Sequence, residues 1–463
     1  MSIEIRKEVW EKLNAIEKDL QLAGLLKYIK EIIAAKRGKD TSEDIHNLER
    51  CFRLLQKEFL IDCLKKFPYK KGTDDERDQK EIKQNIRNAF MSDESEFVKA
   101  HIALVFGTGV SMGEPFSIPN WSSLLQRTHK NYFSERYGGD IIDKDIQNIF
   151  GSTDLYELAQ YLESHLLEDN VREYGEEFRT GTYNRLYSLV GDALYIKSPK
   201  RITKAKLQDS FIGYLTQLTE KYKINRILTY NYDDCFEKTY STLFPTNSIM
   251  PIFVDEQLPF ADETKGKQVY HVHGLIPKYF NYNKRYTIGK THKDWLCSAE
   301  ARHIVLTEDS YDEIAHSNYK WRNTIQADTL VRYNCFIFGF SATDRNFKRL
   351  TRLIDWHQNE VSGRLVSQPV KHYIFLAIDD YLRGIFHESV PSENDTNQNF
   401  FDNLLELKKT NGEYYGVDIV VRKLQFLYYT LCSKRKYLRR FHIYPIWTTI
   451  ADLKGRVQSI IEK

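Results

Sequence analysis

Residues 102–111 read IALVFGTGVS, an apolar run that leads directly into a glycine-rich turn. The run Ile102–Phe106 is typical of a strand that is buried on both faces. Glycine at Gly107 and Gly109 permits a turn in which backbone N–H groups approach a phosphate, because no Cβ blocks the approach. A strand followed by such a turn is found where α/β folds bind nucleotides. The stretch therefore predicts an α/β fold with a nucleotide site at the end of its first strand.

Short β-type runs separated by helical patterns continue along the chain after this stretch. The alternation predicts a doubly wound, mostly parallel, Rossmann-like sheet. The further strands that we expect are Arg226–Thr229, Val269–His273, Ile304–Leu306, Cys335–Phe340, His372–Ile378 and Val417–Val421. Several of them carry a polar or glycine-containing motif at the C-terminal end, where such sheets bind ligands.

The length of 463 residues suggests more than one domain. Residues 1–95 show apolar residues at helical spacing and predict an N-terminal helical region, which serves assembly, regulation or plain packing. Residues 96–463 are expected to form the main α/β domain, with a helical insertion at about 140–220 that covers the ligand crevice. The run 391–399 is expected to be a polar surface loop.

Composition excludes several classes of protein. The net charge of +3 is too small to indicate a dedicated nucleic-acid or membrane partner. No apolar stretch is long enough to span a membrane, and the charged N-terminus does not resemble a signal peptide. The six cysteines contain no CxxC pair, so neither a zinc ribbon nor a disulfide framework is expected. These features predict a cytoplasmic protein with reduced thiols and no metal.

A second motif, TYNYDD at 229–234, follows the expected strand Arg226–Thr229. The amide of Asn231 can hold a water or a ribose hydroxyl at the ligand crevice. Asp233 can accept a hydrogen bond from a ribose hydroxyl. Taken alone, Asp233 or Asp234 is favoured as a cap of the following helix, because Asp is a preferred N-cap residue, whereas the ligand role is favoured for Asn231.

The third motif is HVHG at 271–274. Alternation along a strand would place His271 and His273 on one face. His273, beside a glycine at the strand end, is a candidate general base that titrates near neutral pH. A metal ion shared by the two histidines is the competing interpretation, but no third ligand follows at a suitable spacing.

The fourth motif, GFSATD at 339–344, repeats the arrangement of a strand that enters a glycine turn and predicts a site for the second half of a dinucleotide. Asp344 either caps the next helix or meets a ribose hydroxyl, and the cap is favoured. Trp121 precedes an apolar helical run, where it either packs on the nucleotide or holds the start of the helix, and the second role is favoured.

The order GTGVS, TYNYDD, HVHG and GFSATD resembles the sirtuin family, and within it the bacterial sirtuin-like proteins that destroy NAD⁺ in antiphage defence. The resemblance extends over roughly residues 100–430. It implies a Rossmann-like domain that binds NAD⁺ as a substrate. Two departures matter: the cysteine spacing cannot form the four-cysteine zinc module of protein deacylases, and Thr108 replaces the usual alanine.

The resemblance also implies roles for individual residues. Asn231 would position the attacking water, Asp233 would contact the nicotinamide ribose, and His273 would be the general base. The positions implied to hold the rest of the cofactor are Gly107, Thr108, Gly109 and Ser111 at the phosphates, and Gly339, Phe340 and Ser341 at the adenosine. Trp121 and Asp344 complete the candidate cofactor contacts.

The leading hypothesis is therefore an NAD⁺ hydrolase that releases nicotinamide and ADP-ribose. A non-catalytic sensor of NAD or ADP-ribose and an NAD-dependent protein deacylase are the alternatives. A nucleic-acid-binding role for the basic cluster at 434–440 is disfavoured by the low net charge. Because an unregulated hydrolase would kill its host, we expect a homo-oligomer, and the resemblance implies a partner such as a translocase ATPase or a nucleic-acid sensor.

Overall fold

The structure is a computed structural model that describes residues 50–51, 102–139, 154–174, 178–199, 201–283, 292–316, 320–361, 370–378, 381, 417–448 and 450–461. Apart from Arg50 and Cys51, the helical region predicted at 1–95 lies outside the described residues, as does the polar loop predicted at 391–399. None of the described helices is long and apolar enough to cross a membrane.

The chain divides into two compact units. The larger unit comprises residues 99–372 and 457–463, and the smaller unit comprises residues 1–98 and 373–456. The predicted division at residue 95 assigned residues 373–456 to the same domain as residues 99–372, whereas the structure groups them with the smaller unit. Every candidate site residue belongs to the larger unit.

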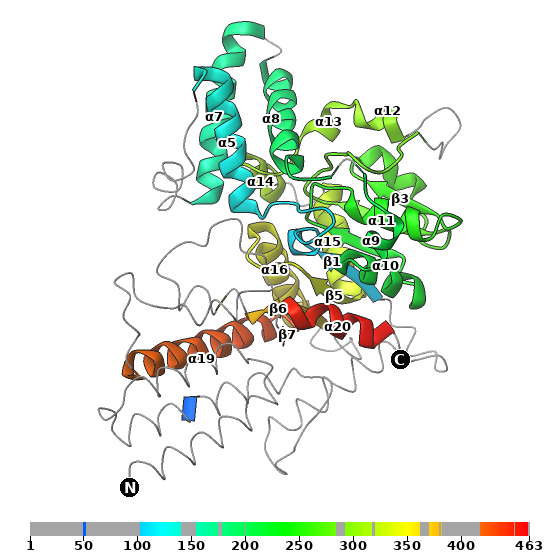
Figure 1. Ribbon diagram of the computed structural model, residues 1–463, viewed down its shortest axis with the longest axis vertical. Coiled ribbons are helices and arrows are strands. Elements are labelled where there is room, and N and C mark those ends of the chain that lie inside the picture. Colours follow the sequence, from blue (N-terminus) through cyan, green and yellow to red (C-terminus); the bar gives the residue numbers. More distant parts are fainter. Residues whose placement is uncertain are drawn as a thin grey trace. The chain divides into compact units, whose positions relative to one another are not determined.

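A parallel β-sheet forms the centre of the larger unit (Figure 1). Its strands follow the order β3-β4-β2-β1-β5, with bounds Ile249–Ile252 (β3), Lys267–His271 (β4), Arg226–Thr229 (β2), Ile102–Phe106 (β1) and Asn334–Phe338 (β5). Strand β1 is central, with β2 on one side and β5 on the other. Its residues from Ala103 to Phe106 are buried, as expected for a strand covered on both faces. These features confirm the predicted α/β, Rossmann-like fold.

The pairing register aligns the C-terminal ends of four strands. Phe106 of β1 pairs with Thr229 of β2 and with Phe338 of β5, and Thr229 pairs with His271 of β4. Because these residues are the last of their strands, the four segments that follow them begin along one edge of the sheet. The order of the strands also reverses at β1, and this reversal is where open α/β sheets bind ligands.

Helices connect the strands of the larger unit. They are α5 (Trp121–Tyr137), α7 (Leu155–Tyr174), α8 (Phe178–Tyr195), α9 (Lys204–Gln208), α10 (Phe211–Lys221), α11 (Cys235–Leu243), α12 (His292–Leu296), α13 (Ala299–Arg302), α14 (Glu308–His316), α15 (Trp321–Arg332) and α16 (Arg345–Val361), with short 3₁₀ helices η1 (Thr108–Val110) and η3 (Asp255–Phe260). The smaller unit contains α19 (Val417–Arg439), strand β7 (Ile443–Thr448) and all of β6 (His372–Ala377) except its first residue, while α20 (Ile450–Ile461) is divided between the units.

Helices α5, α7 and α8 pack side by side in the larger unit (Figure 1). Helix α5 begins at the side chain of Asn120, whose Oδ1 accepts a hydrogen bond from the N–H of Ser123 at 2.8 Å. The buried carboxylate of Asp169 joins the three helices, since it accepts from the hydroxyl of Tyr132 and pairs with Arg136 and Arg185. The described part of the predicted 140–220 insertion is thus largely helical, while its role as a cover stays a prediction.

Several predicted strand bounds differ from the structure. Strand β4 ends at His271, two residues before the predicted end, and β5 ends at Phe338. Residues 304–306 are not a strand, because their backbone bonds to segments other than the sheet: the N–H of Val305 donates to the carbonyl of His273. The residues predicted as the strand Val417–Val421 form the first turns of helix α19.

A pattern longer than the run Val417–Val421 explains why these residues are helical. Val417–Val421 is rich in β-branched residues, but the buried Leu424, Leu427 and Leu431 continue with helical spacing. Strand β3 is absent from the predicted strands, and it contains Pro251, which lacks an N–H group. Because β3 lies at the edge of the sheet, a proline is tolerated there.

Candidate functional site

The turns after β1 and β5 interlock through their glycines. The N–H of Gly107 donates to the carbonyl of Phe338, and the N–H of Gly109 donates to the carbonyl of Gly339, both at 3.0 Å. An added Cβ at Gly109 would lie 2.7 Å from the Cα of Gly339, so the two backbones are in direct contact. Gly339 also adopts a φ of +57°, which favours glycine. The first role of these glycines is therefore to hold two loops against each other.

This contact changes the interpretation of the first glycine motif. The N–H groups of Gly107, Gly109, Val110 and Ser111 all donate to backbone carbonyls within the protein. While these bonds are made, the four groups cannot donate to a phosphate. The predicted phosphate contacts of this loop stay a prediction, and they rest on side chains such as that of the half-buried Thr108.

Gly339→Ala is expected to lower the free energy of unfolding by more than about 2 kcal/mol, since a side chain in the left-handed region is strained and the new Cβ would lie 2.5 Å from the backbone nitrogen of Val110. Thermal unfolding measures the loss. The matched control is Gly113→Ala, because no atom lies within 4 Å of a Cβ at that position. Equal stability of both variants would contradict the interlocked arrangement.

Three polar side chains from the segments that follow β1 and β2 form a buried chain. The hydroxyl of Ser111 donates to Oδ1 of Asp233 at 3.1 Å, and the amide Nδ2 of Asn231 donates to the same hydroxyl at 3.3 Å. All three residues are at most 3% exposed. The sequence prediction placed these residues in one site, and the structure brings them together.

Two oxygen atoms of this chain, Oδ1 of Asn231 and Oδ2 of Asp233, have no hydrogen-bond partner among the described residues, although they are buried. Burial raises the pKa of Asp233. Its other oxygen also accepts from the N–H of Cys235 at 3.1 Å, at the start of α11. Asp233 therefore meets the helix start, as the competing interpretation held, and still has one oxygen free to accept. Buried polar atoms without partners are uncommon and call for a ligand or water.

His271 and His273 occupy different environments. His271 is the last residue of β4, and its Nε2 lies 2.6 Å from the carboxylate of Glu237. His273 lies in the turn that follows the strand, beside Gly274 with a φ of +98°. Because β4 ends at His271, the alternation that was expected to place both histidines on one face of a strand does not apply to His273.

The ring of His273 is surrounded by aromatic side chains. It meets the rings of Tyr230 and Tyr311 edge-on, with centroids 5.0 and 5.5 Å away. Nε2 lies 3.5 Å from Oδ2 of Asp344 but makes no hydrogen bond among the described residues. Burial lowers the pKa of His273, an effect that exceeds the opposing influence of Asp344. The imidazole is therefore neutral at neutral pH and has a nitrogen able to take up a proton.

Asp344 has the capping role that the sequence favoured. Its Oδ1 accepts from the N–H of Phe347 in the first turn of α16 at 2.8 Å. Its Oδ2 accepts from the hydroxyl of Tyr311 at 2.7 Å and faces His273. A ribose contact for Asp344 stays a prediction, since both oxygens already accept hydrogen bonds.

Two aromatic residues predicted as cofactor contacts pack on other rings in the structure, and their contact with a cofactor stays a prediction. Phe340 stacks on Tyr230 with ring centroids 4.5 Å apart and is 9% exposed. Trp121 packs edge-on against Tyr156 at 4.4 Å, at the first position of α5, as expected for a residue that holds a helix start. Ser341 is exposed, and its hydroxyl lies 2.5 Å from that of Thr343.

Sequence reasoning missed the role of Asp234. One carboxylate oxygen accepts the N–H groups of three successive residues, Lys278, Tyr279 and Phe280, at 2.8 to 2.9 Å. Burial raises the pKa of Asp234 to about 6, although these bonds oppose the shift. The two aspartates predict a cap for the following helix, but Asp234 makes no side-chain capping bond. The carboxylate therefore holds the loop after β4 at residues 278–280, and His273 lies in the N-terminal part of that loop.

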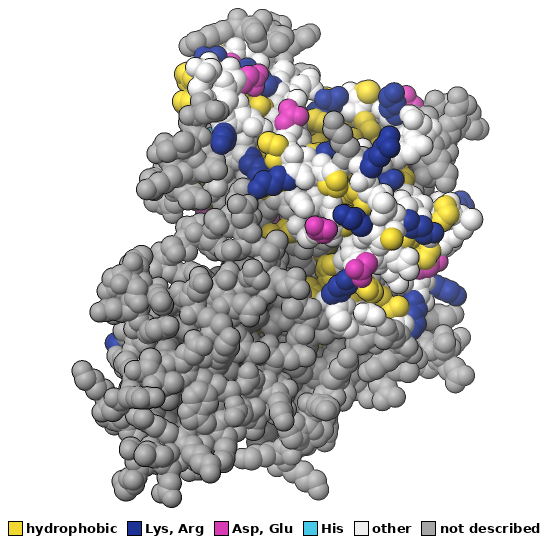
Figure 2. Space-filling view, viewed as in Figure 1, with side chains coloured by type: hydrophobic (Ala, Val, Ile, Leu, Met, Phe, Trp, Pro, Cys, Tyr) yellow, Lys and Arg dark blue, Asp and Glu magenta, His cyan; other side chains and the backbone are white. Residues whose placement is uncertain are grey.

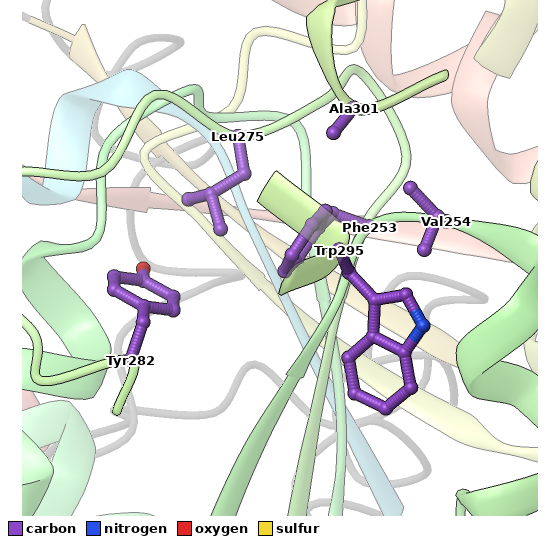
Figure 3. Close-up of a cluster of buried hydrophobic side chains, with 6 residues drawn as sticks. All are labelled: Phe253, Val254, Leu275, Tyr282, Trp295 and Ala301. Atoms are coloured by element: carbon purple, nitrogen blue, oxygen red, sulfur yellow. The ribbon is translucent and has the colours of Figure 1, made fainter. Parts of the chain in front are cut away.

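The same loop is fixed by apolar contacts at both ends. Leu275 and Tyr282 belong to a buried cluster (Figure 3), whose other members are Phe253, Val254, Trp295 and Ala301. The hydroxyl of Tyr187 in α8 donates to the carbonyl of Leu275 at 2.9 Å. The segment after β4 is therefore held by the carboxylate of Asp234, which precedes α11, and by the hydroxyl of Tyr187 in α8.

Comparison with known protein families gives one match. Residues 225–397 match the SIR2-like domain, a span that begins just before β2 and includes Asn231, His273 and Gly339 but not the first glycine motif. No curated protein matches the chain. SIR2-like domains are typically found in NAD-dependent enzymes. This part of the chain is thus similar to the SIR2-like domain, which supports the resemblance that the motifs indicate.

Proposed function

We propose that the protein is an NAD⁺ hydrolase that cleaves NAD⁺ to nicotinamide and ADP-ribose. The observation that carries the proposal is a set of three buried polar atoms without hydrogen-bond partners among the described residues: Oδ1 of Asn231, Oδ2 of Asp233 and Nε2 of His273. They follow the C-terminal ends of neighbouring parallel strands, β2 and β4. Unsatisfied polar groups at this edge of an α/β sheet are suited to a polar ligand.

The chemistry of these atoms fits cleavage of the bond between ribose and nicotinamide. Departure of nicotinamide develops positive, oxocarbenium-like charge on the ribose, as in glycoside hydrolysis. The free Oδ1 of Asn231 can accept from the attacking water, and the free oxygen of Asp233 can accept from a ribose hydroxyl. His273 is neutral and can remove a proton. Neither a metal nor a covalent intermediate is needed for these steps.

The proposed enzyme has a biological setting that the family resemblance supplies. We propose that the activity serves antiphage defence, and that the protein works as a homo-oligomer. A second protein, such as a translocase ATPase or a nucleic-acid sensor, would trigger it. The predicted N-terminal helical region would be the place of that control.

Direct nucleic-acid binding by this chain is the weaker alternative. On the face shown in Figure 2, Lys and Arg side chains are spread over the described surface rather than gathered in one patch. Within the cluster at 434–440, Lys436 and Arg439 lie in the last turn of α19. Positive side chains at a helix C-terminus complement the helix dipole, which gives them a structural role.

The test is NAD⁺ consumption by the purified full-length protein, with products separated by chromatography. Stoichiometric nicotinamide and ADP-ribose support the hydrolase. Binding of NAD⁺ without any turnover, also in the presence of cell extract from infected cells, would instead support the sensor. Transfer of an acyl group from an acyl-lysine peptide would support the deacylase.

A further inference from the structure

A buried ion pair lies directly behind Asn231. Nε2 of His271 is 2.6 Å from Oε1 of Glu237, and each side chain is 1% exposed. Glu237 lies in the first turn of α11. Removing two charges from water costs more than a buried pair commonly returns in stability, so such a pair is weak evidence of a stabilising role alone.

The partners of His271 show how its protons are placed. Nδ1 lies 3.3 Å from the backbone carbonyl of Asn231, and Nε2 faces the carboxylate of Glu237. A carbonyl oxygen only accepts, so Nδ1 carries a proton, and a second proton lies between Nε2 and the carboxyl group of Glu237. Burial opposes a charged ring, but the carboxylate of Glu237, the hydrogen bond to the carbonyl of Asn231 and the charge of Asp233 together outweigh it and raise the pKa of His271. The two contacts and the raised pKa favour an imidazolium next to a carboxylate.

The hydrogen bond from His271 completes the fixation of Asn231. The N–H of Asn231 donates to the hydroxyl of Thr229 at 3.0 Å, its Nδ2 donates to Ser111, and its carbonyl accepts from His271. Oδ1 is the one polar atom of this residue without a partner among the described residues. Three bonds therefore determine where the free oxygen points.

We infer that His271, charged by Glu237, is a positioning residue that holds Asn231 in the orientation required for hydrolysis. The role rests on the proposed function, because it acts through the water-positioning group of that reaction. Its physical basis is that a charged donor makes a hydrogen bond roughly twice as strong as a neutral one. An error of ~1 Å in such a group can cost about 100-fold in rate.

Two substitutions of His271 separate positioning from stability. His271→Asn places an amide N–H near the position of Nδ1 and keeps a donor toward the carbonyl of Asn231. His271→Gln places its amide near Nε2 and keeps only the contact with Glu237. The matched control is His129→Asn, whose shorter amide does not reach the position of Nε2 and so removes a comparable bond to the carbonyl of Leu158, 3.0 Å away, between α5 and α7.

The expected result is a fall in kcat of about 10- to 100-fold for His271→Gln, with the Kd for NAD⁺ changed little. His271→Asn should recover most of the turnover, and His129→Asn should retain it. In the Asn231→Ala background, His271→Gln should cause no further loss of kcat, because the group through which it acts is gone. Equal turnover of the Asn and Gln variants, or additive losses, would overturn the inference.

Two measurements on the protein need no turnover and so separate this inference from the proposed function. ¹⁵N NMR of histidine-labelled protein at pH 7.5 should show His271 as an imidazolium, at a pH where an ordinary histidine is mostly neutral. A neutral ring would overturn the inference. The ¹³C resonance of the Asn231 carbonyl should move in His271→Gln and stay near its wild-type position in His271→Asn. If both variants leave it in place, the inference fails even when NAD⁺ is cleaved.

Discussion

His273→Ala is expected to abolish NAD⁺ hydrolysis, with a loss of about 10²- to 10⁴-fold in kcat, the range for removal of a general base. The neutral ring has a buried nitrogen without a hydrogen-bond partner among the described residues, and no other imidazole in them lies in that turn. Nicotinamide release measures the effect. Turnover within a few-fold of wild type would remove His273 from the mechanism.

The stability of this variant needs its own control, because His273 also fills space between Tyr230 and Tyr311. His129→Ala removes another neutral histidine, whose pKa burial lowers to about 4, from the α5–α7 contact. Both variants should lose some thermal stability, but only His273→Ala should lose turnover. Equal loss of activity in both would indicate damage to the fold instead of loss of a base.

Asn231→Ala is expected to lower kcat by at least about 100-fold while NAD⁺ binding largely survives, since the lost oxygen would act on the attacking water. The substitution leaves Ser111 bonded to Asp233, so it creates no new unpaired hydroxyl. Isothermal titration and turnover measured together distinguish the two effects. If binding vanishes with turnover, Asn231 is a ligand anchor.

Asn170→Ala is the matched control for this prediction. Asn170 is 1% exposed, and its Nδ2 donates to the hydroxyl of Thr182 at 2.9 Å, so it repeats the amide–hydroxyl pair of Asn231 and Ser111 at a distance from the site. Its replacement should reduce thermal stability by a similar amount and leave kcat unchanged. A comparable loss of kcat would show that turnover responds to stability alone.

The sequence predicted the parts of the fold and site that depend on local patterns. A buried apolar run before a glycine turn identified β1 and β5, and the polar motifs after β2 and β4 identified Asn231, Asp233 and His273. The pairing register then brings these motifs together, because parallel strands with aligned C-terminal ends place them along one edge of the sheet. The prediction therefore needed no knowledge of loop structure.

What the sequence could not supply depends on contacts between distant segments. Nothing near Asp234 indicates that its carboxylate binds the backbone of residues 278–280. Glu237 reads as an ordinary first-turn acid of a helix until β4 places His271 beside it. Likewise, the amides of the first glycine motif read as free for a phosphate, but in the structure they donate to the carbonyls of Phe338 and Gly339 and to carbonyls of their own loop.

The central position of β1 has a consequence for any fragment of this protein. The span that matches the SIR2-like domain begins at residue 225, yet the strand that separates β2 from β5 lies at Ile102–Phe106. A chain cut at residue 225 would lose the middle of its sheet and leave two inner strands with unpaired backbone groups, a form prone to aggregate. The recognisable domain is therefore not a folding unit by itself, and its two inner strands can come together only around a strand contributed by sequence more than a hundred residues upstream.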